Sequence, residues 1–172
     1  QTIRNGAALK PDAVIAASST ITLGGLALQI KLAPHAVTAG DVWLYEETSR
    51  VAALGDLVTL PAPFLDTACP QGWKTALAQV ADTPFTVAIP GHGAPMTRAK
   101  FLLYQAAFES FIDCSSSTRP EDECADGWAE SIRPLLSDDP REQRQARGMA
   151  AYYVGVLRAH GGRSKYCTAE PT

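Results

Sequence analysis

The sequence predicts a mixed α/β (α+β) fold with the layering of half an αββα sandwich, followed by a C-terminal helical extension. Apolar residues alternate in two hairpin patterns before residue 60, helical spacing dominates after residue 70, and one apolar strand pattern stands between two predicted helices. Strands followed by helices on one side give a sheet with one covered face. We therefore expect the other face to need a second sheet.

The first hairpin pattern joins strands 20–23 and 26–32 through Gly24-Gly25, because paired glycines suit a two-residue turn between strands. In the second of these strands, large apolar side chains alternate with Ala, Gln and Lys, so we expect the apolar side to be buried. A second hairpin joins strands 42–46 and 51–54 through a polar turn. The four strands are predicted to form one antiparallel sheet. The positions expected to be buried in the second strand are Leu26, Leu28, Ile30 and Leu32.

Helical spacing begins at Pro70, a residue that suits the first turn of a helix, and the large apolar residues that follow it recur every three to four positions. The continuous apolar run 85–89 predicts a strand that is buried on both faces. A helix over residues 97–113 comes next, with Thr97 as its N-terminal cap.

Two further helices are predicted over residues 125–136 and 140–160. Asp138 or Asp139 suits the cap of the second helix, and Gly161-Gly162 is typical of a helix end. Because stripes of Met and Tyr are usually buried, we expect this pair of helices to pack on the core. A lid or a dimer surface is the alternative interpretation.

Composition narrows the classes of partner. The chain has 172 residues, 46% of them hydrophobic, and a formal net charge of -3. This charge argues against nucleic acid as a partner, and no apolar run approaches the roughly 20 residues of a membrane span. The remaining expectation is a globular chain that acts on a small molecule.

The four cysteines indicate the compartment. They allow three pairings, and Cys114 with Cys124 is favoured because the two flank a polar loop, which leaves Cys69 with Cys167. An even number of cysteines without C-x-x-C spacing favours disulfides and so a periplasmic or secreted protein. Four buried, reduced thiols in a cytosolic protein are the alternative.

Two short motifs place metal-binding side chains at strand ends. Asp56 follows Gly55 at the end of one apolar run, and His92 lies in Pro90-Gly91-His92-Gly93, directly after strand 85–89. A carboxylate and a neutral imidazole at the rim of a sheet are ligands that a divalent metal accepts. Each has a structural alternative, since Gly-Asp is common in turns and a loop histidine often bonds a carbonyl. Together they favour a metal site.

Four pieces of sequence stand in one order: Thr38-Ala-Gly-Asp41, Val42-Trp-Leu-Tyr45, Val51-Ala-Ala-Leu-Gly-Asp56 and Pro90-Gly-His-Gly93. This order resembles the second half of a metallo-β-lactamase-fold hydrolase, and the residues of the motifs are closer to those of glyoxalase II than to those of the lactamases. The resemblance implies that residues 1–113 are the C-terminal half of such a domain and that residues 114–172 are a helical extension packed on it.

The resemblance also implies a chemistry. Metal-bound hydroxide would attack an ester, thioester, amide or phosphoester, with Asp56 bridging two ions and His92 completing the second site. Zinc is the implied metal, as one or two ions, with iron or manganese as alternatives. Substrate contacts would come from the loop 60–68 and from the segment after His92.

Two departures from the family pattern affect this site. The family's His-x-His-x-Asp-His cluster does not occur in the 172 residues, and Val37 stands where the family has a His before the Thr-x-Gly-Asp turn. His35 shares a strand face with Val37 but lies about 7 Å further back, which makes it a weaker third metal candidate. Asp56, His92 and His35 do not furnish a two-metal site. We therefore expect an N-terminal fragment or a partner chain to carry the remaining ligands; the alternative is a degenerate, metal-free binding or assembly module.

Two other polar residues have predicted structural roles. Asp41 is expected to accept backbone donors in the turn that precedes strand 42–46. His160 lies at the end of the last predicted helix, where a partly positive side chain complements the helix dipole.

Overall fold

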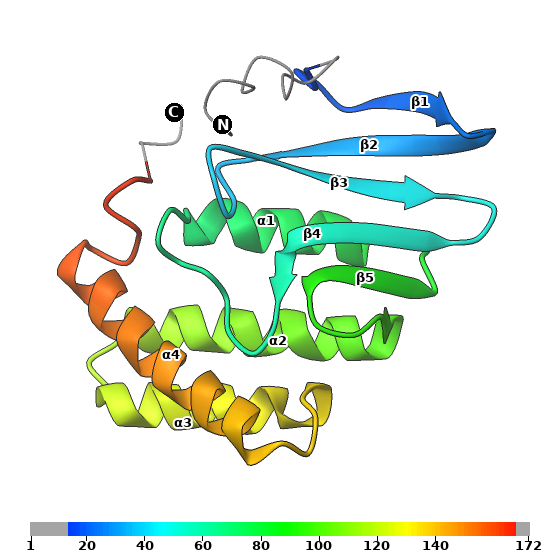
Figure 1. Cartoon of the computed structure of the whole chain (residues 1–172). Helices are drawn as coiled ribbons and strands as arrows, with labels where there is room; N and C mark the ends of the chain where they lie inside the picture. The colour runs from blue at the N-terminus through cyan, green and yellow to red at the C-terminus, as the bar shows by residue number, and fades with distance from the viewer. Residues whose placement is uncertain (1–13, 168–172) are drawn as a thin grey trace, which may run out of the picture.

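A computed structural model describes residues 14–167, which form a six-stranded mixed sheet with helices against one side of it (Figure 1). The fold class predicted from the sequence is confirmed. The elements in chain order are β1 (Ser19–Leu23), β2 (Leu26–Pro34), β3 (Gly40–Glu46), β4 (Val51–Thr59), α1 (Pro70–Ala81), β5 (Val87–His92), β6 (Met96–Thr97), α2 (Arg98–Ser115), α3 (Glu121–Ile132), the 3-10 turn η2 (Arg133–Leu135) and α4 (Pro140–Ala159). Residues 1–13 of the predicted half-domain (1–113) and residues 168–172 of the predicted helical extension (114–172) lie outside the described residues.

The strands lie side by side in sequence order, from β1 to β6. The first four are antiparallel neighbours, which confirms both predicted hairpins. Gly24 and Gly25 have φ angles of 59° and 84°, the left-handed conformation that a two-residue hairpin turn requires. β5 pairs parallel to β4 because α1 carries the chain back along the sheet. This crossover brings the C-terminal ends of β2, β4 and β5 to the same edge of the sheet.

One face of the sheet, which we call the covered face, packs against α1 and α2 (Figure 1). Large side chains from both helices, such as Trp73 and Phe108, fill the space beneath it and are fully buried. Helices α3 and α4 pack on α2 and on each other, so they form a further layer. The covered face consists of Trp43, Tyr45, Ala52, Leu54 and Ala88, all of them at most 3% exposed.

The opposite side of the sheet, the outer face, is also apolar. The strand register places its members on one side, since Ile30 pairs with Leu44, and Ala53 pairs with both Leu44 and Ile89. Leu26 is 54% exposed and Ile89 is 42% exposed, and a hollow of about 250 Å³ lies over β2, β3 and β4. The outer face consists of Ile21, Leu23, Leu26, Leu28, Ile30, Leu32, Val42, Leu44, Val51, Ala53, Val87 and Ile89.

Two predictions about strand burial are therefore wrong. The apolar side of β2 points away from the helices, and of its four members only Ile30 is buried. β5 is buried on one side only, because Val87 and Ile89 belong to the outer face. In both strands the alternation identified an apolar side correctly, but it did not identify what covers that side.

The helices begin close to where the sequence predicts. Thr97 caps α2 by accepting a hydrogen bond from the amide of Lys100, and Asp139 caps α4 by accepting one from the amide of Arg141. α3 differs from its prediction, since it begins at Glu121 and continues into η2 after Ile132. On α4 the predicted apolar stripe is incomplete, because Tyr152 is 60% exposed.

Both disulfides have the favoured pairing, Cys114 with Cys124 and Cys69 with Cys167. Together they are consistent with an oxidising compartment outside the cytoplasm. Within residues 14–167, no helix has the length and apolar character needed to cross a bilayer.

Candidate metal centre

Asp56 reaches the sheet edge because β4 is irregular just before it. Gly55 has a φ of 53°, and the pairing of β4 with β5 shifts register on both sides of this glycine. A left-handed residue next to a register shift is typical of a β-bulge, which bends the strand and redirects the following side chain. Figure 1 shows β4 turning sharply before its end. The result is an Asp56 side chain that is 54% exposed.

The glycines around His92 allow the two motifs to approach closely. A Cβ atom on Gly91 would clash with the Asp56 carboxylate and would lie 2.7 Å from the backbone carbon of Gly55. Gly93 has a φ of 119°, and a Cβ there would lie 3.2 Å from the Leu60 side chain. Glycine is therefore needed at both positions flanking His92.

His92 and Asp56 meet at this edge. The His92 Nε2 atom lies 3.6 Å from the Asp56 Oδ1 atom, and about half of each side chain is exposed. This separation is too long for a hydrogen bond, and both groups keep open positions toward solvent. The structure thus brings together the two residues that the sequence named first.

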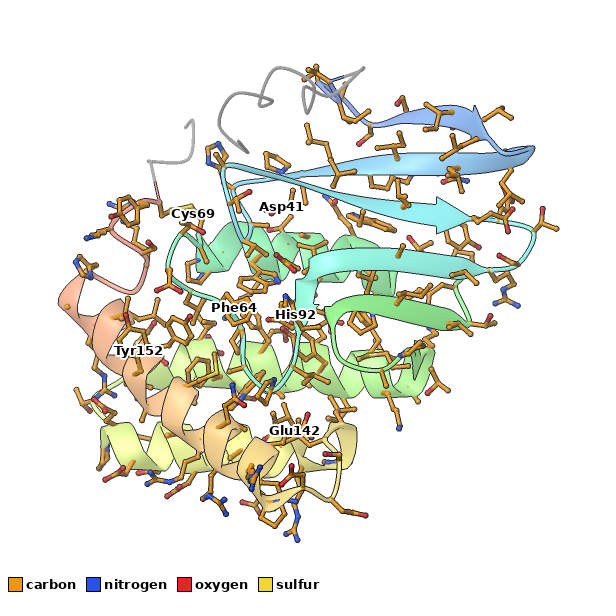
Figure 2. The ribbon with its side chains drawn as sticks, viewed as in Figure 1. Asp41, Phe64, Cys69, His92, Glu142 and Tyr152 are labelled. Carbon is orange, nitrogen blue, oxygen red and sulfur yellow. A yellow bond between two sulfur atoms is a disulfide. The ribbon has the colours of Figure 1, made fainter. Side chains whose placement is uncertain are left out.

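An aromatic residue that the sequence did not single out completes the surroundings of His92. The Phe64 ring stands edge-on to the imidazole, with 5.2 Å between ring centroids (Figure 2). The amide of Leu60 donates a hydrogen bond of 3.0 Å to the His92 carbonyl. Both residues lie in the loop between β4 and α1, the loop predicted to contact substrate. The Pro-rich sequence signalled a loop, but nothing in it signalled which side chain would reach His92.

His35 is held elsewhere. It has a φ of 51° in the turn between β2 and β3, and a Cβ on Gly72 of α1 would clash with its carbonyl oxygen. Its buried Nδ1 atom has no hydrogen-bond partner. No group of three or more His, Cys, Asp or Glu side chains within residues 14–167 lies close enough to hold a metal ion. The structure therefore does not group His35 with Asp56 and His92.

The turn after His35 is closed by Asp41 (Figure 2). The Asp41 carboxylate accepts hydrogen bonds of 2.9 Å from both the amide and the hydroxyl of Thr38. Asp41 therefore has the structural role predicted for it. Val37 is buried, at 4% exposure, and its carbonyl accepts a hydrogen bond from the Thr67 hydroxyl.

Comparison with solved structures identifies the architecture. A metallo-β-lactamase from Pontibacter korlensis superposes with a TM-score of 0.52 at 21% identity, over 63% of this chain and 54% of that one. A metallo-β-lactamase family protein from Thermus thermophilus superposes with a TM-score of 0.51 at 17% identity, over 88% and 50%. This chain shares the metallo-β-lactamase fold. The stereoselective inverting sec-alkylsulfatase Pisa1 from Pseudomonas sp. matches 94% of this chain with 29% of its own, with a TM-score of 0.51 at 15% identity.

The likeness is structural and partial. No protein-family model and no curated protein matches the sequence. The chain spans about half the length of the two metallo-β-lactamase structures. At these identities the comparisons describe the fold and leave the chemistry to the residues themselves.

The residues at the edge of this metallo-β-lactamase fold suit a divalent metal in kind but not in number. Imidazole and carboxylate are both accepted zinc ligands, and the open sides of Asp56 and His92 leave room for an ion. A catalytic zinc has three protein ligands, and the described part of the chain offers two that converge. Asp56 and His92 therefore fit one side of a metal site in kind, and the described residues do not complete such a site.

Proposed function

We propose that this chain supplies one half of a metal-dependent hydrolase of the metallo-β-lactamase fold. The observation that supports the proposal is the Asp56–His92 pair, which three glycines hold at one sheet edge. Gly55 and Gly93 have positive φ angles, and a Cβ atom on Gly91 would clash with its neighbours. In the proposed site Asp56 and His92 bind and orient the metal. When bound there, zinc, or alternatively iron or manganese, would supply Lewis-acid activation of water toward an ester, thioester, amide or phosphoester.

The remaining ligands come, in this proposal, from an N-terminal segment or partner chain that packs on the outer face. A continuous apolar sheet face of twelve side chains favours a second sheet, since stacked sheets pack about 10 Å apart through such faces. Ala53 and Ile89 of this face each precede a metal candidate by three residues, about 10 Å along a strand. A sheet packed there reaches the metal site.

The proposed location of the complete protein is the periplasm or the extracellular space. Disulfides persist in these compartments and are rare in the cytosol. Cys69 and Cys167 are separated by 98 residues and Cys114 and Cys124 by 10, so the two disulfides close one long and one short loop of the chain.

Metal analysis tests the proposed function. We expect the protein, purified from its source cells without chelator and in the complex in which it occurs, to hold one or two zinc ions and to contain polypeptide beyond these 172 residues. His92→Ala and Asp56→Asn should each lower zinc affinity by more than about 100-fold, since loss of an outer-shell partner alone costs about 10- to 100-fold. His160→Ala is the matched control, because the His160 Nδ1 atom bonds the Val156 carbonyl of its own helix.

A metal-free binding or assembly module is the second candidate function. It is favoured by the buried Val37, which stands where the resemblance places a metal-binding His. Two results would establish this module in place of the hydrolase. The source-purified protein would hold no metal, and His92→Ala and Asp56→Asn would each leave its metal content and its hydrolysis of esters and thioesters unchanged. Loss of metal and of ester or thioester hydrolysis in both variants, with His160→Ala unchanged, would exclude it.

A further inference from the structure

The loop 60–69, between β4 and α1, forms one wall beside His92 and is anchored to the sheet. The Cys69 amide donates a hydrogen bond of 2.8 Å to the Ala36 carbonyl, and the Thr67 hydroxyl donates one of 2.7 Å to the Val37 carbonyl. The Leu60 amide bonds the carbonyl of His92 itself. These bonds fix the two ends of the loop but not its middle, where Phe64 lies.

The loop is also held from the C-terminal part of the chain, at one residue before Phe64 and one after it. The Trp128 indole of α3 donates a hydrogen bond of 3.0 Å to the Pro61 carbonyl. The Tyr153 hydroxyl of α4 donates one of 2.6 Å to the Asp66 carboxylate, across 87 residues of sequence. This part of the chain therefore bonds the loop on both sides of Phe64.

The segment after α4 adds three more links. The Ser164 hydroxyl donates to the Asp66 carbonyl, and the Ser164 amide donates a hydrogen bond of 3.2 Å to the Ala68 carbonyl. Cys167 is covalently joined to Cys69 at the end of the loop (Figure 2 labels Cys69).

Burial and the neighbouring Asp66 carboxylate raise the pKa of Tyr153, so the phenol remains a neutral donor at ordinary pH.

We propose that Tyr153, Ser164 and the Cys69–Cys167 disulfide are positioning groups that hold the loop 60–69 so that Phe64 packs against His92. In this arrangement the helical extension acts on the site through the loop and touches no reacting atom. The importance of this positioning for hydrolysis rests on the proposed function, but the positioning itself does not. Released from these groups, the loop keeps its ends and loses the fixed position of Phe64.

The imidazole resonances of the chain give a direct test, because the sequence contains only three histidines. Phe64→Leu removes the aromatic ring whose centroid lies 5.2 Å from that of the imidazole, so this variant defines the full displacement expected of the His92 Hε1 resonance at one fixed pH. We expect Tyr153→Phe and the double variant C69S/C167S to move the His92 resonance a substantial part of the way toward its Phe64→Leu position. The His35 and His160 resonances are recorded in the same spectra. His160 lies beside Asp66 and Ser164, so it reports release of the segment after α4 and not the position of Phe64.

Matched controls separate positioning from general loosening of the fold. Tyr152→Phe removes a hydroxyl from the neighbouring exposed tyrosine and keeps its ring, so we expect no displacement. C114S/C124S removes the other disulfide, which joins α2 to α3. Because Trp128 of α3 also bonds the loop, we expect a smaller displacement here than in C69S/C167S. Asp66→Asn keeps an acceptor oxygen for Tyr153 and should retain the wild-type resonance, whereas Asp66→Leu should not.

Hydrogen exchange of the loop peptide provides a second readout at low protein concentration. Tyr153→Phe and C69S/C167S should speed exchange of the amides in the middle of the loop, residues 64–66, roughly tenfold, the effect of losing about one hydrogen bond. The Leu60 amide, which holds one end of the loop, and the amides in β3 should be unchanged. An unmoved His92 resonance with unchanged loop exchange in both variants would overturn the proposal. Neither readout requires a metal, so failure of the proposed hydrolase function would leave both results intact.

Discussion

The covered face and the outer face are built from alternate residues of the same strands, yet they have opposite surroundings. Trp43 and Leu54 are 1% exposed on the side of α1 and α2, whereas Val42, the residue before Trp43 in β3, is 39% exposed. Both faces are apolar. The contrast shows that alternation in a strand reports the chemistry of each side, while burial depends on whether another layer is present.

The two faces also differ in what they contribute to the protein. The covered face stabilises the chain by burying aromatic and aliphatic groups within it. The outer face offers a contiguous apolar surface of the kind that marks an interaction site. This division explains how a chain that spans about half the length of the two metallo-β-lactamase structures can hold a core and still leave one face of its sheet uncovered.

The largest expected effect is a difference in the free energy of unfolding between a substitution on the covered face and one on the outer face. Leu54→Ala should lower the free energy of unfolding by about 2–5 kcal/mol, because it opens a cavity in the core. Leu26→Ala should lower it by less than about 0.5 kcal/mol, since this side chain is already 54% exposed in the chain by itself. Urea unfolding of the chain measures both. Equal losses in the two variants would show that the outer face is covered in solution.

A charge on the outer face should alter association more than stability. Val42→Lys should reduce self-association of the chain at high concentration and leave its urea midpoint within the range of ordinary surface substitutions, about 0.5 kcal/mol. Light scattering measures the first quantity. Leu102→Lys is the control, because Leu102 has a similar exposure of 41% but lies on α2 and not on the outer face. A variant that associates as strongly as the wild type would remove the support for a docking face.

A glycine at the sheet edge, beside the metal candidates, should be needed for stability, whereas a glycine in helix α3 should not. Gly91→Ala should cost about 1–3 kcal/mol, because its Cβ meets the Asp56 carboxylate and the Gly55 backbone. Gly127→Ala in α3 has open space around it and should stabilise the chain by up to about 1 kcal/mol through helix propensity. Urea unfolding compares the two. A neutral Gly91→Ala would mean that the approach of His92 to Asp56 is not tight in solution.

Local sequence patterns predicted the parts of this molecule that depend on local chemistry. The paired glycines at 24 and 25 indicated the first hairpin, and Thr97 and Asp139 identified helix starts, because turns and caps depend on a few neighbouring residues. Asp56 and His92 were predicted together from their glycine-flanked strand ends and from the order of the motifs. In the structure they meet because the crossover makes β5 parallel to β4, so that the two strand ends lie at one edge.

The remaining features depend on contacts between residues far apart in sequence. His35 was a metal candidate only while the chain around it was taken as extended, and its left-handed turn, packed on Gly72, removes that basis. The link from Tyr153 to Asp66 spans 87 residues and has no sequence motif. The side of β2 that the helices would cover was likewise set by tertiary packing, which the period of two does not encode.

The smallest expected effect lies at the rim of the outer face, in the turn between β3 and β4. Hydrogen bonds from Ser49, and from the amide of Thr48, lower the pKa of Glu46 to about 2. Because the folded pKa lies below the unfolded value of 4.5, the carboxylate stabilises the turn fully above about pH 4.5, and this contribution is lost as the pH falls toward about 2. The stability difference between wild type and Glu46→Gln should therefore be constant from about pH 7 to about pH 5 and shrink steadily below that, as measured by urea unfolding. A difference that stays constant down to about pH 3 would show that Glu46 holds the turn by shape and not by charge, and that the rim of the outer face is insensitive to acid.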